Sequence, residues 1–357
     1  MKLTGTQSLL LAAIVLVCVA MSGPGDDDQH HVRMSTGVLI WNDDQLARLD
    51  LRKPVKSSGV VECAVTPLER AGTRLTPSNG SRAVASFLEA VPDAMIPMRP
   101  AALRLGDGRW AIVADNFGGG THILQLAVVR SDLLAVAGRG SSTPRAEPKL
   151  IDHIKVPDAA EGRTFFNLTY PTLIEHKERL YIIASAGFLW DRPPMVVIAA
   201  ADTYDKGDLR GRVMGQGFCP RVVKLGNEFV CAVRYADRHP DVKDPATPIR
   251  LYRSADLENW KQMPSPDESF RFTRFDLATD GEAICLLGVG EKNDTPVTKL
   301  LRFNAKAQVW TAKDAELSVP DAKTDVRLLP RSAQRAKMTA VVPDASGDLT
   351  VAELRAP

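Results

Sequence analysis

The stretch YRSADLENW, residues 252–260, follows a run of alternating apolar residues and shows how one strand of this chain ends. Ser254 and Asp256 favour a tight turn, because their side-chain oxygens can bond nearby backbone N–H groups. Trp260 is a large apolar side chain that can fold back beside the preceding strand. The segment therefore predicts a self-contained turn in which Asp256 is a local hydrogen-bond acceptor.

Six segments repeat one pattern, in which an apolar half-strand, a polar turn and a second apolar half-strand follow one another. They begin at Gly37, Ala101, Pro171, Arg221, Phe275 and Met338. Asp-Gly, Gly-Asn and Ser-Gly at their centres are strong hairpin signals, because these residues tolerate positive φ. Successive hairpins lie roughly 50 to 70 residues apart, in or above the range of propeller repeats.

Several hairpins are followed by a third apolar run, and two of these runs end alike, at Trp260 and Trp310. We expect the two tryptophans at equivalent positions of neighbouring units, each packed over its own turn. A small antiparallel sheet cannot bury its faces alone, so repeated sheets pack radially. We therefore predict that residues 35–357 form one all-β domain, a six-bladed β-propeller. Five blades are the alternative, because the first hairpin is the least regular.

Two segments, residues 66–95 and 139–165, lack the alternation of strands and are expected to form loops or a short helix. Within the first, the stretch SRAVASFLEAV is compatible with a helix that Ser81 would cap at its N-terminus.

Residues 1–22 differ from the rest of the chain. Lys2 precedes an almost continuously apolar run from Leu9 to Ala20, and a small-x-small cleavage pattern follows. The run is short for a hydrocarbon layer of about 30 Å. We predict a secretory signal peptide at residues 1–22 and a flexible mature N-terminus at residues 23–34, with the protein secreted or held in the periplasm or cell envelope. An uncleaved N-terminal membrane anchor is the alternative.

Composition narrows the class of ligand. The 357 residues carry a formal net charge of +2 without a basic block, which argues against nucleic acid as the main partner. Cys63, Cys219, Cys231 and Cys285 show no C-x-x-C spacing, so a structural zinc site is not expected. Export permits a disulfide between Cys219 and Cys231, and buried free thiols are the alternative. We expect neither a metal nor a cofactor.

Three segments resemble the sialidase superfamily of propellers. Ser254, Asp256 and Trp260 resemble a degenerate Asp-box, shortened by one residue and without the usual glycine, and the same turn is similar to one in five-bladed glycoside hydrolases. Residues 96–115, IPMRPAALRLGDGRWAIVAD, are similar to the Arg-Ile-Pro segment and strand pair that open the sialidase fold. In residues 222–260, Arg234 takes the place of a central-pocket arginine. Together the segments cover most of residues 96–310.

The resemblance implies how a substrate would be held. In this family three arginines clamp the substrate carboxylate, because their planar forks of donors suit it. Arg99 and Arg234 are the implied substrate-binding residues, and Arg331 or Arg335 could supply the third basic group. The alternative for Arg99 and Arg234 is a structural role at the rim, paired with carboxylates. A carbohydrate or acidic glycan is the implied partner.

Catalysis in this family uses a tyrosine nucleophile activated by a glutamate, and an aspartate as acid and base. Tyr235 and Asp115 are the candidates here, although neither occupies the usual place. The sequence departs further: no second arginine lies near Phe117, the glutamate position falls near Cys219, and the last hairpin has no tyrosine.

We therefore expect a protein that recognises glycans or acidic sugars at its central face with a degenerate catalytic site. The alternatives are an active exo-sialidase or other glycoside hydrolase with a rearranged site, and a non-catalytic propeller that binds protein.

Overall fold

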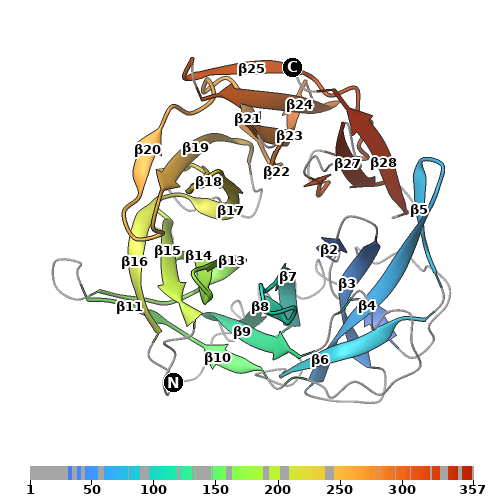
Figure 1. The fold of residues 1–357 in the computed structure, drawn as a ribbon, viewed down its shortest axis with the longest axis vertical. Helices are drawn as coiled ribbons and strands as arrows, with labels where there is room; N and C mark the ends of the chain where they lie inside the picture. Colours follow the sequence, from blue (N-terminus) through green and yellow to red (C-terminus); the bar gives the residue numbers. More distant parts are fainter. Residues whose placement is uncertain are drawn as a thin grey trace, which may run out of the picture.

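The computed structural model is built almost entirely of β-strands, which confirms the predicted all-β class (Figure 1). It describes residues 31–33, 38–41, 45–54, 60–78, 80–88, 96–118, 121–130, 133, 146, 148–157, 163–187, 193–201, 209–237, 245–280, 282–293, 295–305, 307–321, 324–329, 337–344 and 348–355. The predicted signal peptide lies outside the described residues. Within them, no helix is long and apolar enough to cross a membrane.

Five hydrogen-bonded sheets stand around a ring. The nine-stranded sheet joins both ends of the chain and contains β1 (His31–Arg33), β2 (Val38–Trp41), β3 (Leu46–Pro54), β4 (Val60–Ala71), β5 (Arg74–Pro77), β6 (Arg82–Leu88), β26 (Arg327–Leu329), β27 (Met338–Pro343) and β28 (Leu349–Leu354). A four-stranded sheet contains β7 (Ile96–Arg104), β8 (Trp110–Gly118), β9 (Thr121–Val129) and β10 (Lys149–Ile151).

The other three sheets come in chain order around the ring (Figure 1). The six-stranded sheet contains β11 (Ile154–Val156), β12 (Arg163–Phe165), β13 (Thr169–His176), β14 (Arg179–Ala186), β15 (Met195–Ala200) and β16 (Leu209–Gln216). The five-stranded sheet contains β17 (Phe218–Leu225), β18 (Glu228–Arg234), β19 (Thr247–Ser254), β20 (Lys261–Met263) and β21 (Arg271–Phe272). The second four-stranded sheet contains β22 (Arg274–Thr279), β23 (Ile284–Lys292), β24 (Thr295–Asn304) and β25 (Val309–Asp314).

All six predicted hairpins are present as antiparallel strand pairs. They are β2–β3, β7–β8, β13–β14, β17–β18, β22–β23 and β27–β28. The predicted third runs are also strands, because β9, β15, β19 and β24 each pair with the second strand of their hairpin. In Figure 1 the strands β2, β7, β13, β17 and β22 lie nearest the middle of the ring, and in the nine-stranded sheet β26 ends the strand order after β27. We call these six strands the inner strands.

Three inner strands share one irregularity. The register shifts in β7 between residues 97 and 100, in β13 between residues 169 and 172, and in β17 between residues 218 and 221. Over each interval the partner strand contributes one residue fewer than the inner strand. The extra residue is Tyr170 in β13, with a φ of 50°, and Cys219 in β17, with a φ of 53°. A β-bulge of this kind bends the strand and increases its twist. The repeated bulge therefore marks three equivalent units of one architecture.

The expectation of a helix from Ser81 is wrong, because this stretch forms the strand β6 against β4. Val84, Ala85 and Phe87 are each 0% exposed there, so burial in the sheet outweighs the local preference. The two segments predicted as loops also contain strands. Residues 66–95 contain the end of β4 and the strands β5 and β6, and residues 139–165 contain the short strands β10, β11 and β12.

Six clusters of buried apolar side chains fill the spaces between neighbouring units. Each cluster draws on two units that adjoin one another around the ring, for example β2–β4 with β8, β14 with β18, and β23 with β27. The last cluster lies inside the nine-stranded sheet, where Leu39 and Leu75 contact Leu329 and Val351. The faces of each sheet are therefore buried by both neighbours, as radial packing requires.

The ring is closed by a short pairing between its ends. β28 pairs with β5 through Leu349 with Leu75 and Thr350 with Arg74, and the amide of Val351 donates to the carbonyl of Thr73 at 2.7 Å. At the other border of this sheet, the residues of β1, which belong to the predicted N-terminal tail, pair with Arg52–Pro54 of β3.

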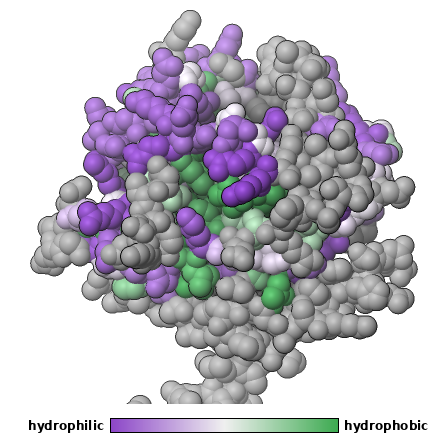
Figure 2. All heavy atoms as spheres, turned by 60° about the horizontal axis from the view of Figure 1, so that its bottom comes forward, coloured by the Kyte–Doolittle hydropathy of each residue, from purple (hydrophilic) through white to green (hydrophobic). Residues whose placement is uncertain are grey.

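The surface is polar with a few apolar exceptions. Viewed toward the edge of the ring that is lowest in Figure 1, apolar residues are visible in the middle of the face, with hydrophilic residues above them (Figure 2). Among the described residues, the large apolar side chains exposed to solvent are Leu150, Phe166 and Val309.

The four cysteines of the described chain are buried free thiols. Cys231 lies opposite Val222 in the sheet, so it does not face Cys219. Burial raises the pKa of the Cys285 thiol to about 12.

The turn after β19 has the predicted form. Asp256 Oδ1 accepts from the amides of Glu258 and Asn259, each at 2.8 Å, and from the Ser254 hydroxyl at 2.9 Å. Trp260 Nε1 donates to the carbonyl of Leu257 at 3.0 Å, so this tryptophan packs over its own turn. The hydrogen bonds from Asn259, Glu258 and Ser254 hold the pKa of Asp256 below its ordinary value.

Trp310 occupies the corresponding place after β24 but makes a different contact. Its ring lies 5.2 Å from that of Phe303, its partner across the hairpin, while its Nε1 donates to Pro264 O at 2.9 Å. Pro264 follows β20 of the preceding sheet, so the hydrogen bond of Trp310 connects two neighbouring units. It does not stabilise the turn before Trp310, although the sequence predicted that contact.

We expect Asp256→Ala to lower the free energy of unfolding by about 1–2 kcal/mol, because the turn amides lose their acceptor. Since the folded-state pKa lies below the ordinary 3.8, this contribution is present above that pH and is lost as the pH falls through the folded-state pKa. Urea unfolding at pH 7 and in acid measures both effects. Glu258→Ala, in the same turn, removes only an exposed pair with Arg212 and is the control. Equal losses in the two variants would contradict the prediction.

Candidate functional site

Two of the predicted substrate-binding arginines have no described side chain. Arg99 lies in β7 next to the repeated bulge, and only its backbone is described. Arg331 lies outside the described residues, as does Arg335. Their roles stay predictions.

Arg234, the last residue of β18, is 1% exposed. Its Nε donates to the hydroxyl of Thr247 at 3.2 Å, and its Nη2 donates to the carbonyl of Pro245 at 2.5 Å. The guanidinium lies 4.6 Å from the centre of the Phe218 ring, a cation–π distance. These contacts hold the loop before β19 against β17, and a role in binding substrate stays a prediction.

Asp115, in β8, is 0% exposed. Its Oδ2 accepts from the amide of Tyr170 at 3.2 Å, at the bulge of the next inner strand β13. The carboxylate therefore links two neighbouring units through the backbone, and its role as an acid or base stays a prediction.

Tyr235 directly follows β18, and its hydroxyl donates to Asp237 Oδ1 at 2.5 Å. The guanidinium of Arg250 lies 3.1 Å from the centre of its ring. The hydrogen bond to Asp237 and burial raise the pKa of Tyr235, although Arg250 acts in the opposite direction. A raised pKa stabilises the neutral phenol, which is the reverse of what a tyrosine nucleophile needs.

A cluster of charged side chains on consecutive inner strands was not identified from the sequence. Arg221 on β17, Arg274 on β22 and Arg327 on β26 belong to three adjacent units, and Asp276 and Asp325 lie among them. Ion pairs bring these side chains together between adjacent inner strands. We call these five residues the axial cluster.

Ion pairs in the axial cluster run from unit to unit. Arg221 Nε lies 3.7 Å from Asp276 Oδ1, and Arg274 Nε lies 3.5 Å from Asp325 Oδ1. Asp276 Oδ2 also accepts from the amide of Leu328 on β26 at 2.8 Å. Asp276 thus joins three successive inner strands.

The arginines keep part of their surface open to solvent while sitting close enough to affect one another. The side chains of Arg221 and Arg274 are 26% and 24% exposed. Burial and then the charge of Arg327 lower the pKa of Arg221, whereas Asp276 raises it. Three arginines thus lie close together beside two aspartates.

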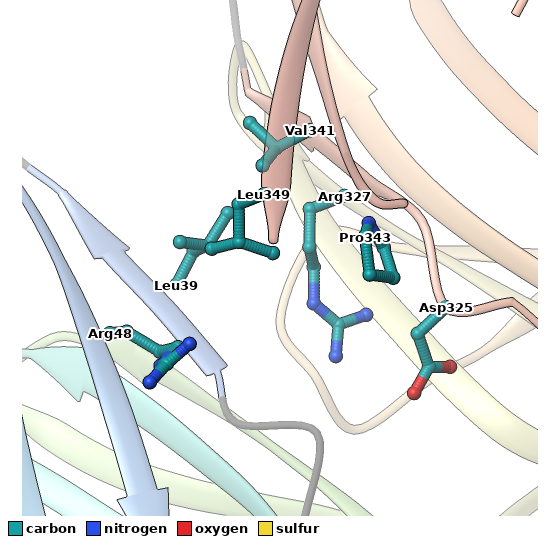
Figure 3. Close-up of a pocket in the computed structure, with 7 residues that line it drawn as sticks. All are labelled: Leu39, Arg48, Asp325, Arg327, Val341, Pro343 and Leu349. Atoms are coloured by element: carbon teal, nitrogen blue, oxygen red, sulfur yellow. The ribbon is translucent and has the colours of Figure 1, made fainter. Parts of the chain in front are cut away.

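A second group of charges, on β3, adjoins the axial cluster. Arg48 Nε lies 2.7 Å and Arg52 Nη2 3.8 Å from Asp50 Oδ2, so one carboxylate serves two arginines. Arg48 lines a pocket together with Asp325 and Arg327, which brings the two groups together (Figure 3). The combined set contains Arg48, Arg52, Arg221, Arg274, Arg327, Asp50, Asp276 and Asp325.

The sequence does carry a signal for this set. Arginine and aspartate stand two residues apart in residues 48–50, 274–276 and 325–327. Residues i and i+2 of a strand point to the same face, so each motif places opposite charges side by side. Among the described residues, no group of histidine, cysteine, aspartate or glutamate side chains is arranged to hold a metal ion.

Comparison with solved structures identifies the fold. No known protein family matches the chain, and no curated protein is similar to it in sequence. The NanB sialidase of Streptococcus pneumoniae superposes with a TM-score of 0.54 at 9% identity, covering 93% of this chain and 70% of that one. A neuraminidase-like protein from A/bat/Guatemala/164/2009 gives 0.53 at 10% identity, covering 95% and 94%.

A mutant of Trypanosoma rangeli sialidase with trans-sialidase activity gives a TM-score of 0.50 at 9% identity, covering 93% of this chain and 56% of that one. At such low identity these similarities establish the fold alone. The chain has a sialidase-like β-propeller fold.

We expect Asp276→Ala to lower the free energy of unfolding by about 3 kcal/mol or more, because Arg221 and the amide of Leu328 both lose their partner in a largely buried place. Chemical denaturation measures the loss. Asp314→Ala is the control, since that carboxylate is 76% exposed and pairs only with Lys299 among its described contacts. A loss no greater than that of Asp314→Ala would show that Asp276 does not join the inner strands.

Proposed function

We propose that the protein is an exported six-bladed propeller that binds acidic glycans near its axis and does not hydrolyse them efficiently. The observation that carries this proposal is the axial cluster. Three arginines on adjacent inner strands, joined by Arg48 and Arg52 and only partly neutralised, form a positive, partly desolvated surface at the middle of the ring. Guanidinium groups in such a place bind carboxylates by charge-assisted hydrogen bonds.

The count of six blades is supported by the way the units bury their faces. The nine-stranded sheet counts as two blades, β2–β6 and β26–β28, because an apolar cluster lies between its two halves as it does between any other neighbours. The strand β5 then serves both blades by pairing with β4 and with β28. Five blades would leave that cluster without an explanation.

The weakness of catalysis is inferred from the contacts of the candidate residues. The Tyr235 hydroxyl is engaged by Asp237, and the Asp115 carboxylate is fully buried against a backbone amide. Cys219 stands where the family has a glutamate, and its amide donates to the Ser185 hydroxyl at 3.0 Å. General acid–base and nucleophilic catalysis both require groups within reach of the bound sugar, and these side chains are committed elsewhere.

Binding and turnover are tested with a fluorogenic sialoside and with sialyllactose against lactose in calorimetry. We expect no efficient turnover, and binding of sialyllactose that Arg274→Gln weakens at least about tenfold through the loss of a charged hydrogen-bond donor. Arg302→Gln is a matched control. Arg302 is also 24% exposed and pairs through Nε with an aspartate, Asp280 at 2.9 Å, but it lies on β24, the third strand of its sheet.

Three results would contradict the proposal in different ways. Clear sialoside turnover that Arg274→Gln abolishes would make the protein an active sialidase. Equal binding of lactose and sialyllactose would remove the role of charge. Binding of neither glycan would favour a propeller that binds protein.

Export is the second part of the proposal, and it rests on the short apolar run of residues 1–22. We expect the mature chain to begin near Ser22 or Gly23 and to be found outside the cytoplasm. N-terminal sequencing of the protein from its native host measures this. An intact Met1 in the membrane fraction would favour the anchor, and an intact Met1 in the cytoplasm would contradict export altogether.

A further inference from the structure

The place where the first and last blades meet contains a pocket of mixed character. It lies between β2 and β3 on one side and β26, β27 and β28 on the other, and Figure 3 shows Arg48 across from Arg327 and Asp325. Leu39, Val341, Pro343 and Leu349 form the rest of its lining. We call it the seam pocket.

Arg327 supplies positive charge to the seam pocket that no carboxylate neutralises within ion-pair distance in the described part of the chain. Its Nη1 donates to the carbonyl of Val326 at 3.3 Å. The one acidic side chain of the lining, Asp325, already pairs with Arg274. Arg48 shares Asp50 with Arg52, so its charge is only partly balanced. An anion in the pocket would meet two arginines from opposite sides of the seam.

The lining between the arginines is apolar. Leu39, Val341 and Leu349 are 6%, 2% and 8% exposed, so they present the edge of the buried core rather than solvated side chains. An apolar substituent beside the anionic group would cover this wall and leave water.

We propose that the seam pocket binds a carboxylate that carries a small apolar substituent, with the carboxylate between Arg48 and Arg327 and the substituent against Leu39, Val341 and Leu349. The inference rests on the proposed function for the anionic nature of the ligand. It adds a further anion site at the seam between the first and last blades, where Arg327 has no carboxylate within ion-pair distance in the described part of the chain, whereas Arg221 and Arg274 each pair with an aspartate.

Binding at the seam has a consequence for closure of the ring. The paired residues of β5 and β28 connect the two blades at their outer strands, and one of them, Leu349, also lines the seam pocket. A ligand held by Arg48 and Arg327 would add a second connection nearer the axis. Since it binds the folded protein only, it raises the unfolding temperature as its concentration rises.

The test uses acetate, propionate and butyrate as probes, with chloride at the same ionic strength as the reference. Thermal unfolding of the full chain is followed as each salt is added. We expect the unfolding temperature to rise more than in chloride, with apparent affinity increasing about three- to fourfold per methylene as more apolar surface is covered. The rise in unfolding temperature should be lost in Arg327→Gln and kept in Arg253→Gln. Arg253 lies in β19, is exposed and pairs with Glu228, so its replacement is the control.

Two results would overturn the proposal: no rise above chloride in the wild type, or an equal rise in Arg327→Gln. Should Arg327→Gln fail to fold, calorimetric titration of butyrate into the wild type and Arg327→Lys decides, because lysine keeps the charge and loses the planar fork. At least about fivefold weaker binding by Arg327→Lys supports the proposal, and unchanged binding overturns it.

The outcome is separable from that of the proposed function. Butyrate binding that depends on Arg327, without sialyllactose binding, would support the seam pocket as a carboxylate site and contradict the proposal that the protein binds acidic glycans. Sialyllactose binding that depends on Arg274, without any response to butyrate, would support the proposed glycan binding and contradict only the proposal for the seam pocket.

Discussion

The structure depends on the pairing of β5 with β28. Every sheet in the ring has two apolar faces, and a sheet buries both only if it has a neighbour on each side. The first and last units would lack one neighbour in an open arc, so the cluster of Leu39, Leu75, Leu329 and Val351 forms only when the two ends of the chain meet. The pairing is short, and most of the free energy that favours closure therefore comes from burial of this cluster rather than from its hydrogen bonds.

Closure places the inner strands next to one another around the ring, and this explains why aspartates accompany the arginines there. Guanidinium groups on adjacent strands repel one another and lose part of their hydration, as the lowered pKa of Arg221 shows. Asp276 and Asp325 offset the repulsion by pairing with the arginine of a neighbouring unit. The same arrangement leaves Arg327 with the least compensation, because no carboxylate lies within ion-pair distance of it in the described part of the chain.

The fold could be predicted from the sequence because its hairpins carry local signals. Alternation and turn residues are properties of a few consecutive positions, and all six hairpins and the turn at Asp256 formed as expected. The helix expected from Ser81 failed because Phe87 and Val84 are buried by β4, a partner that local propensity does not contain. The bulges at Tyr170 and Cys219 also escaped prediction, since both residues adopt a positive φ that their own side chains disfavour.

The site was harder to predict for a physical reason. Motif resemblance directed attention to single residues such as Arg234, whose guanidinium is buried against Phe218 and the loop before β19. The axial cluster and the adjoining charges of β3 are instead assembled from segments far separated in sequence. Three of these segments carry an arginine and an aspartate two residues apart, and each such pair alone looks like an ordinary solvated surface. Only the ring brings residues 48–50, 274–276 and 325–327 together. In a radial fold, charged pairs that recur in several units therefore say more about where those units meet than any one residue does.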